Sequence, residues 1–147
     1  MRKKGNDDMK QDKQAGGLAG IYQATSRGFG FLVPEAGGGR EDDWFIPPRA
    51  EGGAWHGDRV LVKLTERKNG RGRREAAVLR VLQRAGNELT GALVQRGNAY
   101  FVQPTSKKYP EIAIDRHNLG DARVGDRVAV SVSYYGDEKV APQGVIQ

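Results

Sequence analysis

Short apolar runs, separated by turns that contain glycine, follow one another along most of this chain. β-Branched residues dominate many of these runs, and a Gly-Asp pair precedes both Arg59-Val60-Leu61-Val62 and Arg127-Val128-Ala129-Val130. Gly-Asp favours a turn, and the residues that follow it fit a pleated sheet. The expected strands are 18–25, 28–33, 43–47, 58–66, 73–84, 87–95, 98–104, 111–114, 126–134 and 138–146. The pattern predicts an all-β protein.

The strand pattern occurs twice, as an internal repeat shows. Gly57-Asp58-Arg59-Val60 recurs letter for letter as Gly125-Asp126-Arg127-Val128. Five strands in about 65 residues is the size of an OB-fold barrel, whose closure removes exposed edges. We therefore predict two consecutive five-stranded OB-fold (cold-shock-type) barrels, at 18–85 and 86–147. Residues 1–17 have almost nothing to bury and are expected to be a disordered lead-in or linker.

Aromatic residues are placed unusually in the first copy, in Arg27-Gly28-Phe29-Gly30-Phe31-Leu32 and Asp42-Asp43-Trp44-Phe45-Ile46-Pro47. Side chains alternate faces along a strand, so Phe29 and Phe31 are expected on one side, about 6.6 Å apart. With Phe45 from the neighbouring strand they would form a platform on which unpaired bases stack.

The alternative is that these three rings are core residues of a small barrel. A core strand has little use for the glycines that flank Phe29, because filling those sites would improve packing. The glycines, Arg27 and the second aromatic strand therefore favour the platform. Trp44 has the parity opposite to Phe45 and is assigned to the core or a barrel end with Ile46.

Charge adds a second argument for a polyanionic partner. The net charge is +6, and the pI is near 9.7. Between Lys63 and Arg84 eight basic residues stand against two acidic ones, an excess equal to that of the whole chain. Such a run is either a solvated face or a contact for phosphates. The basic residues predicted to contact phosphates are Arg27, Lys63, Arg67, Lys68, Arg71, Arg73 and Arg74.

The composition argues against several other classes of protein. The chain has no cysteine, no apolar stretch of about 18 residues, and no N-terminal pattern of a secretory leader. Disulfide-stabilised, membrane-bound and secreted proteins are therefore disfavoured. The cytoplasm is the expected compartment, and no membrane partner is expected.

The strings RGFGFL and DDWFIP resemble the two ribonucleoprotein motifs of cold-shock domains, which bind single-stranded nucleic acid on an OB fold. By this resemblance Phe29, Phe31 and Phe45 match the stacking aromatics and Arg27 the leading basic residue. Pro47 stands where cold-shock proteins commonly have a histidine, so one contact of the motif is replaced.

A narrower resemblance covers residues 18–147. Trp55-His56-Gly57-Asp58-Arg59-Val60-Leu61-Val62, Gly72-Arg73-Arg74-Glu75-Ala76 and Val78-Leu79-Arg80-Val81-Leu82 are similar, in the same order, to segments of the RNase R and RNase II exoribonuclease family, and most similar to RNase R. The resemblance implies the tandem cold-shock domains that precede the catalytic domain. The implied function is to hold and guide single-stranded RNA for a 3′-to-5′ exoribonuclease; the alternative is a free-standing cold-shock-type RNA chaperone.

In that family a separate domain with clustered aspartates and a divalent metal hydrolyses RNA, and nothing in this chain matches it. Asp7-Asp8 and Asp42-Asp43 are adjacent pairs whose side chains would point to opposite faces of a strand. His56 and His117 have no partner at ligand spacing and are expected in turns. No catalytic residue, metal site or cofactor is therefore expected. The expected partners are single-stranded RNA, single-stranded DNA as well, and a catalytic domain of the same polypeptide.

The second copy has fewer aromatic residues. Aligned on Pro104, the platform positions become Ala99 and Phe101, and no aromatic residue lies in Glu111-Ile112-Ala113-Ile114. Two alternatives remain open. This barrel contributes charge and shape, or it is a structural partner of the first; the charges concerned are Arg96, Lys107 and Lys108.

Overall fold

The computed structural model describes residues 17–35, 43–68 and 72–147, with the side chains of residues 66 and 67 left aside. The chain divides into two compact units, one ending at Ala85 and the other beginning at Gly86. The lead-in expected at 1–17 falls outside the described residues except for Gly17. That residue belongs to the first strand rather than to the lead-in, because it pairs with Lys63 of a neighbouring strand.

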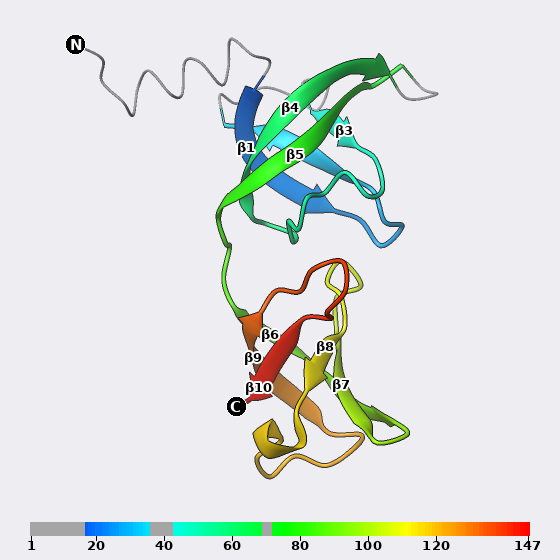
Figure 1. The fold of residues 1–147 in the computed structure, drawn as a ribbon, viewed down its shortest axis with the longest axis vertical. Coiled ribbons are helices and arrows are strands. Elements are labelled where there is room, and N and C mark those ends of the chain that lie inside the picture. Colours follow the sequence, from blue (N-terminus) through cyan, green and yellow to red (C-terminus); the bar gives the residue numbers. More distant parts are fainter. Residues whose placement is uncertain (1–16, 36–42, 69–71) are drawn as a thin grey trace, which may run out of the picture. The chain divides into compact units, whose positions relative to one another are not determined.

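The first unit is a closed five-stranded barrel (Figure 1). Its strands are β1 (Gly17–Ala24), β2 (Gly30–Pro34), β3 (Trp44–Ile46), β4 (Arg59–Lys68) and β5 (Arg74–Gln83). They close in the order β1-β2-β3-β5-β4, and all neighbours are antiparallel except β3 and β5, which are parallel.

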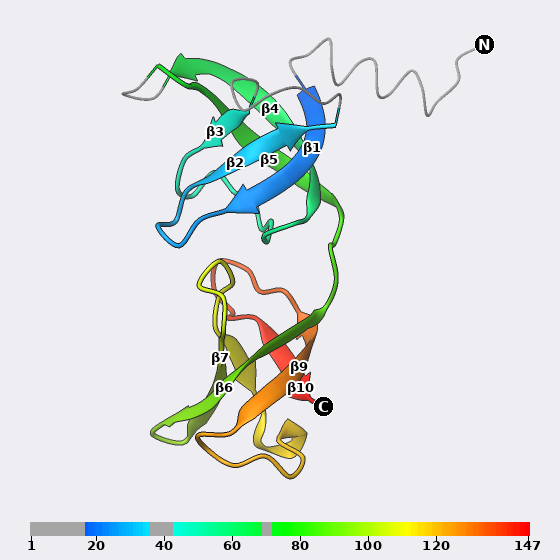
Figure 2. The same ribbon diagram turned by 180° about the vertical axis from the view of Figure 1, so that it is seen from behind.

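The second unit repeats this topology (Figure 2). Its strands are β6 (Glu88–Arg96), β7 (Ala99–Pro104), β8 (Ile112–Ile114), β9 (Arg127–Tyr134) and β10 (Gln143–Ile146), with a 3₁₀ helix, η2, at Arg116–Asn118. The order is β10-β8-β7-β6-β9, and β8 and β10 form the parallel pair. The predicted all-β fold of two five-stranded barrels is confirmed.

The last strand is shorter than the expected 138–146. The carboxylate of Asp137 accepts the N–H groups of Lys139 and Val140, both at 2.8 Å, so these amides complete a turn instead of a sheet. The strand begins only at Gln143.

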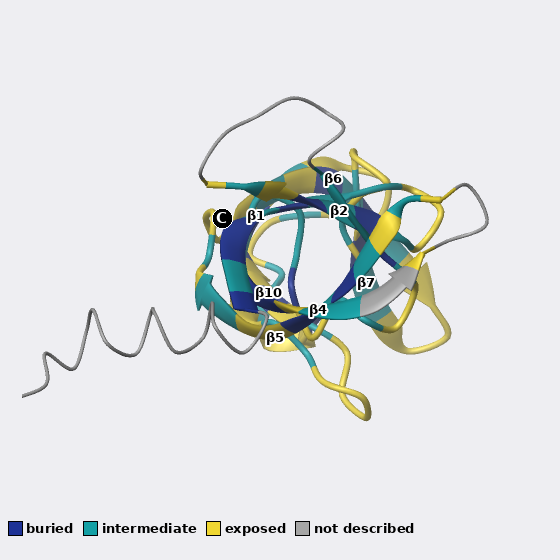
Figure 3. Cartoon of the chain, turned by 90° about the horizontal axis from the view of Figure 1, so that it is seen from above, coloured by how far each residue is buried: buried dark blue, intermediate teal, exposed yellow. Residues whose placement is uncertain are grey.

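Alternation of side chains separates core from surface in each barrel. In the first unit Leu32, Ile46, Val60 and Val62 are completely buried. Figure 3 shows such buried segments alternating with more exposed ones along the strands. The β-branched residues that follow each Gly-Asp turn therefore supply the interior, as a half-buried strand requires.

Gly30 is needed on the interior side of β2, where the ring of Tyr22 packs. A Cβ at position 30 would lie 2.6 Å from a carbon of that ring, closer than any real contact. Burial, and then the charge of Glu51, raise the pKa of Tyr22 to about 12. The glycine that flanks the aromatic residues therefore makes room for a core tyrosine.

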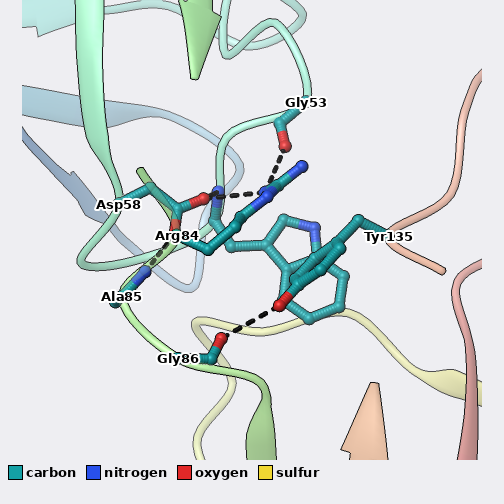
Figure 4. A network of polar contacts seen from close by, with 7 residues as sticks. Gly53, Asp58, Arg84, Ala85, Gly86 and Tyr135 are labelled. Atoms are coloured by element: carbon teal, nitrogen blue, oxygen red, sulfur yellow. Dashed lines mark hydrogen bonds and ion pairs between the residues drawn. The ribbon is translucent and has the colours of Figure 1, made fainter. Parts of the chain in front are cut away.

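A buried carboxylate holds the end of the first barrel together (Figure 4). Asp58 is 2% exposed, and its oxygens accept the N–H groups of Trp55 at 2.8 Å and Ala85 at 2.9 Å. The guanidinium of Arg84 donates to Asp58 at 2.7 Å and to the carbonyl of Gly53 at 2.9 Å. Arg84, which belongs to the basic run of the sequence, therefore has a structural role.

In the second barrel the aspartate at the repeated position is not buried. Asp126 is exposed and accepts the N–H of Arg123 at 2.9 Å. Within this unit the Tyr135 hydroxyl donates to the carbonyl of Gly86 at 3.0 Å (Figure 4). The Gly-Asp repeat thus keeps its turn, while the buried ion pair belongs to the first copy.

Candidate nucleic-acid interface

Three phenylalanine rings lie together on the first barrel, and we call Phe29, Phe31 and Phe45 the platform. The ring centroids of Phe29 and Phe45 are 5.4 Å apart, those of Phe29 and Phe31 5.7 Å, and those of Phe31 and Phe45 5.9 Å. The rings meet at tilted or edge-on angles, the arrangement that aromatic quadrupoles favour. Residues from two strands and a turn therefore form one continuous aromatic surface.

The platform faces away from the barrel core. Phe31 and Phe45 are paired across β2 and β3, and their chain neighbours Leu32 and Ile46 are completely buried. Side chains alternate along a strand, so the two rings point outward. All three platform residues are half-buried.

Phe29 is placed by a turn rather than by a strand. The sequence predicted a strand from 28, but β2 begins at Gly30. Both the N–H of Thr25, at 3.1 Å, and its hydroxyl, at 2.7 Å, donate to the carbonyl of Phe29. The hydroxyl oxygen also accepts the N–H of Arg27 at 3.2 Å. Gly28 has φ +94°, which favours glycine, so the chain can turn there and still bring the Phe29 ring against Phe31.

Two arginines beside β3 lie against aromatic rings, one over a platform ring and the other over Trp44. The guanidinium carbon of Arg73 is 5.1 Å from the ring centroid of Phe31. That of Arg74 is 4.1 Å from the centroid of Trp44, which packs against the core as its parity predicted. The parallel pairing of Phe45 with Glu75 brings the beginning of β5 beside β3. Positive charge and stacking surface are therefore adjacent, as cation–π contacts allow.

The other basic residues are less closely tied to the platform. Arg27 is exposed in the turn before Phe29, and Lys63 and Lys68 are exposed on β4. The side chain of Arg67 and the whole of Arg71 lie outside the described residues. Contact of these side chains with phosphates stays a prediction.

The second barrel has the same framework with different side chains. Phe101 pairs with Ala113 as Phe31 pairs with Phe45, so alanine occupies the position of the third ring. The guanidinium of Arg96 lies 4.9 Å from the centroid of Phe101 and forms an ion pair with Glu111. Hydrogen bonds from Arg96 hold the pKa of the Glu111 carboxyl below its usual value. Phe101 is therefore covered by an arginine that is itself anchored.

The two histidines differ in which of their atoms form hydrogen bonds. The imidazole Nδ1 of His56 accepts the N–H of Ala24 at 3.1 Å. For His117 it is the backbone N–H that donates, to the carboxylate of Asp115 at 2.9 Å at the beginning of η2. Among the described residues, no group of three or more His, Cys, Asp or Glu side chains is placed to hold a metal ion. Asp7-Asp8 and Asp42 lie outside them. No helix in the described part of the chain is long and apolar enough to cross a membrane.

Comparison with known proteins finds a ribonuclease domain family and several ribonucleases to which this chain is similar. The family described as "Ribonuclease B OB domain" matches residues 20–81. Ribonuclease R of Acidithiobacillus ferrooxidans is 34% identical over 130 residues, which cover 86% of this chain and 29% of the relative. Ribonuclease R of Vibrio parahaemolyticus is 30% identical over 120 residues, covering 81% of this chain and 14% of the relative. The chain thus spans less than a third of the length of these relatives.

A solved structure shares the fold. The structure of Mycoplasma genitalium RNase R in complex with ribose methylated single-stranded RNA has a TM-score of 0.71 and 17% identity, covering 88% of this chain and 21% of that one. This likeness concerns the fold of the barrels, while the family match and the curated relatives concern the sequence. The chain therefore belongs to the N-terminal OB and cold-shock region of the RNase R and RNase II family.

Proposed function

We propose that this chain is a single-stranded RNA-binding module of an RNase R-like 3′-to-5′ exoribonuclease, and that it holds and guides RNA by aromatic stacking and phosphate contacts. The observation that carries this proposal is the platform. Three half-buried rings within 5.4–5.9 Å of one another lie outside the core, where burial of each ring on folding is incomplete. Unpaired bases stacked on such rings would complete that burial.

The surroundings of the platform support a nucleic acid as ligand. Arg73 lies over Phe31, so a strand that stacks on the rings would have phosphates near this guanidinium group. Arg74, the next residue in the chain, lies over Trp44, which is not one of the platform rings. Stacking contributes about 1–3 kcal/mol per base and does not depend on base identity. Binding should therefore tolerate sequence. Single-stranded DNA should also bind, because stacking and phosphate contacts do not require a 2′-hydroxyl.

The relatives support RNA as the physiological ligand. Ribonuclease R proteins match over both barrels, and one solved relative carries single-stranded RNA. In this proposal hydrolysis belongs to a catalytic domain that holds a divalent metal, and the present chain binds RNA without cutting it. A free-standing RNA chaperone would bind in the same way, but the match to a ribonuclease OB family favours the exoribonuclease.

The proposal is tested by titrating the chain into fluorescent single strands of about ten nucleotides, within the range that OB folds cover. We expect saturable binding to single-stranded RNA and DNA, and much weaker binding to duplex RNA, because pairing hides the base faces. Incubation with Mg²⁺ or Mn²⁺ should leave the RNA intact. Equal affinity for duplex and single strands would contradict the platform, and metal-dependent cleavage by the purified chain would contradict the assignment of hydrolysis elsewhere.

A further inference from the structure

The second barrel has a groove where the first has its platform. The groove has a volume of about 650 Å³ and crosses β7, β8, β9 and β10, with η2 along one side. Ala99, Phe101 and Ala113 are among the residues that line it. Pockets of about 300–1,000 Å³ are typical of small-ligand sites.

The groove occurs where the second barrel has alanine in place of two platform rings, on a backbone framework that both barrels share. Ala113 pairs with Phe101 and Gln143, just as Phe45 pairs with Phe31 and Glu75. Alignment on Pro104 places Ala99 at the position of Phe29. Because the backbone pairing is the same in both barrels, replacing phenylalanine by alanine leaves a hollow instead of a raised surface.

The neighbouring strands β9, beside β10, and β4, beside β5, are also equivalent in the two barrels. The hydroxyl of Ser133 donates to the carbonyl of Gln143 at 3.2 Å, as the hydroxyl of Thr65 donates to the carbonyl of Glu75 at 3.2 Å. The two barrels therefore present one framework with two surfaces. The first surface is aromatic, and the second is recessed and polar.

Side-chain amides surround the groove. Asn98, Asn118 and Gln143 all line it, and within the described part of the chain none of these three amides makes a hydrogen bond to the protein. Each amide offers two N–H donors and one carbonyl acceptor. Asp115 and Arg116 stand at the η2 side with opposite charges, so the groove does not favour an anion. It favours a flat, neutral ligand with donors and acceptors on its edge.

We propose that this groove binds one unpaired nucleobase of the RNA strand by its hydrogen-bonding edge, so that the second barrel discriminates between bases while the first only stacks them. This inference rests on the proposed function, because a single strand must reach the second barrel. Bases of unpaired RNA are commonly read on their Watson–Crick edges. The ring of Phe101 is already covered by Arg96, so the amides of the groove provide the recognition.

The first test observes the groove directly by NMR. The chain is uniformly ¹⁵N-labelled and titrated with single-stranded RNA homopolymers of adenine, uracil or cytosine, each of about ten nucleotides. We expect the side-chain NH₂ signals of Asn98, Asn118 and Gln143 to shift, and to shift differently with each base. Asn87, an exposed asparagine outside the groove, is the internal control and should not respond. Shifts confined to the first barrel would overturn the inference while leaving the proposed function intact.

The second test fills the groove. Ala113→Phe restores the ring found at the equivalent position of the first barrel, and Gln143→Ala removes one amide. One hydrogen bond corresponds to a preference of about fivefold between bases. Both variants should reduce the spread of Kd among the homopolymers to less than about twofold, whereas Asn87→Ala should preserve it.

The outcomes separate the two proposals. If Ala113→Phe and Gln143→Ala retain the wild-type preference, the groove is not the site of base discrimination. If the wild-type chain binds all homopolymers equally through the first barrel, the inference fails and the proposed function stands. If the wild-type chain binds none of them at low salt, the proposed function itself fails. Thermal melts of each variant verify that the second barrel is folded.

Discussion

Removing two rings of the platform tests the proposed interface most directly. In Phe29→Ala/Phe45→Ala only Phe31 remains, so two stacking positions are lost. At about 1–3 kcal/mol per base, single-strand binding should weaken by about 2–5 kcal/mol. Since about 1.4 kcal/mol corresponds to a factor of ten, Kd should rise between about 30-fold and several thousandfold.

The same change has a cost in stability that must be measured beside it. The double variant removes all three ring pairs of the platform, each worth about 0.5–1.5 kcal/mol. Truncating a fully buried Phe to alanine costs about 3–5 kcal/mol of stability. The platform rings are half-buried and lie outside the core cluster, so the double variant should lose less stability than two such truncations. Phe29→Leu/Phe45→Leu keeps apolar contact without a π-face and is the matched variant.

The assay is fluorescence anisotropy with a labelled single strand, run beside thermal melts. Phe101→Ala is the comparison variant in the second barrel, where Arg96 covers the ring. Phe101 lines the proposed groove, but the groove's amides provide the recognition there, so this change should weaken overall binding by less than about 1 kcal/mol. The leucine variant should lose nearly as much binding as the alanine variant while melting closer to wild type. A Phe29/Phe45 variant that melts early yet binds normally when folded would refute the reasoning, because the rings would then support the core and the RNA surface would lie elsewhere.

Three further predictions follow from charge and burial. The logarithm of the binding constant should fall with that of salt concentration at about −0.7 per neutralised phosphate; Arg73→Ala/Arg74→Ala should flatten this slope, and an unchanged slope would exclude these residues from phosphate contact. Asp58→Ala should lower the free energy of unfolding by about 2–4 kcal/mol in denaturant titrations, because it removes the acceptor of two backbone N–H groups and one of the acceptors of the Arg84 guanidinium. The change Asp126→Ala, at an exposed aspartate, should cost less than about 1 kcal/mol. Tyr22 should ionise near pH 12 in an absorbance titration. The stabilisation that goes with its raised pKa is fully present below about pH 10 and is lost as the pH rises toward 12. Tyr22→Phe should remove the late transition from the titration.

Local features of the sequence were sufficient for the approximate positions of the strands and for the direction of the Phe31 and Phe45 rings. Turn chemistry and β-branched runs are short-range signals, so the repeated Gly-Asp-Arg-Val segments located equivalent strands in both barrels. Parity along a strand requires no knowledge of the partner strand, and it placed Phe31 and Phe45 opposite the buried Leu32 and Ile46. The roles of these rings in binding stay predictions that the experiments above address.

Barrel closure determines contacts between distant strands, which the alternation of side chains along one strand cannot predict. The parallel pairing of β3 with β5 joins segments about 30 residues apart and brings Arg73 and Arg74 against aromatic rings. Closure also returns the end of β5 to the turn before β4, which is why Arg84 meets Asp58. These contacts depend on the register between strands, and a charge count along the chain treats every arginine alike.

The tertiary structure also decided what replaces a missing side chain. From the sequence, the alanines at positions 99 and 113 mean only that the second copy has fewer rings. On the closed barrel Ala113 pairs with Gln143, which comes from the last strand of the repeat. Both alanines line one groove together with Gln143 and residues of η2. A recess is a property of several strands at once, because its walls come from segments whose proximity depends on the fold and cannot be deduced from any one of them.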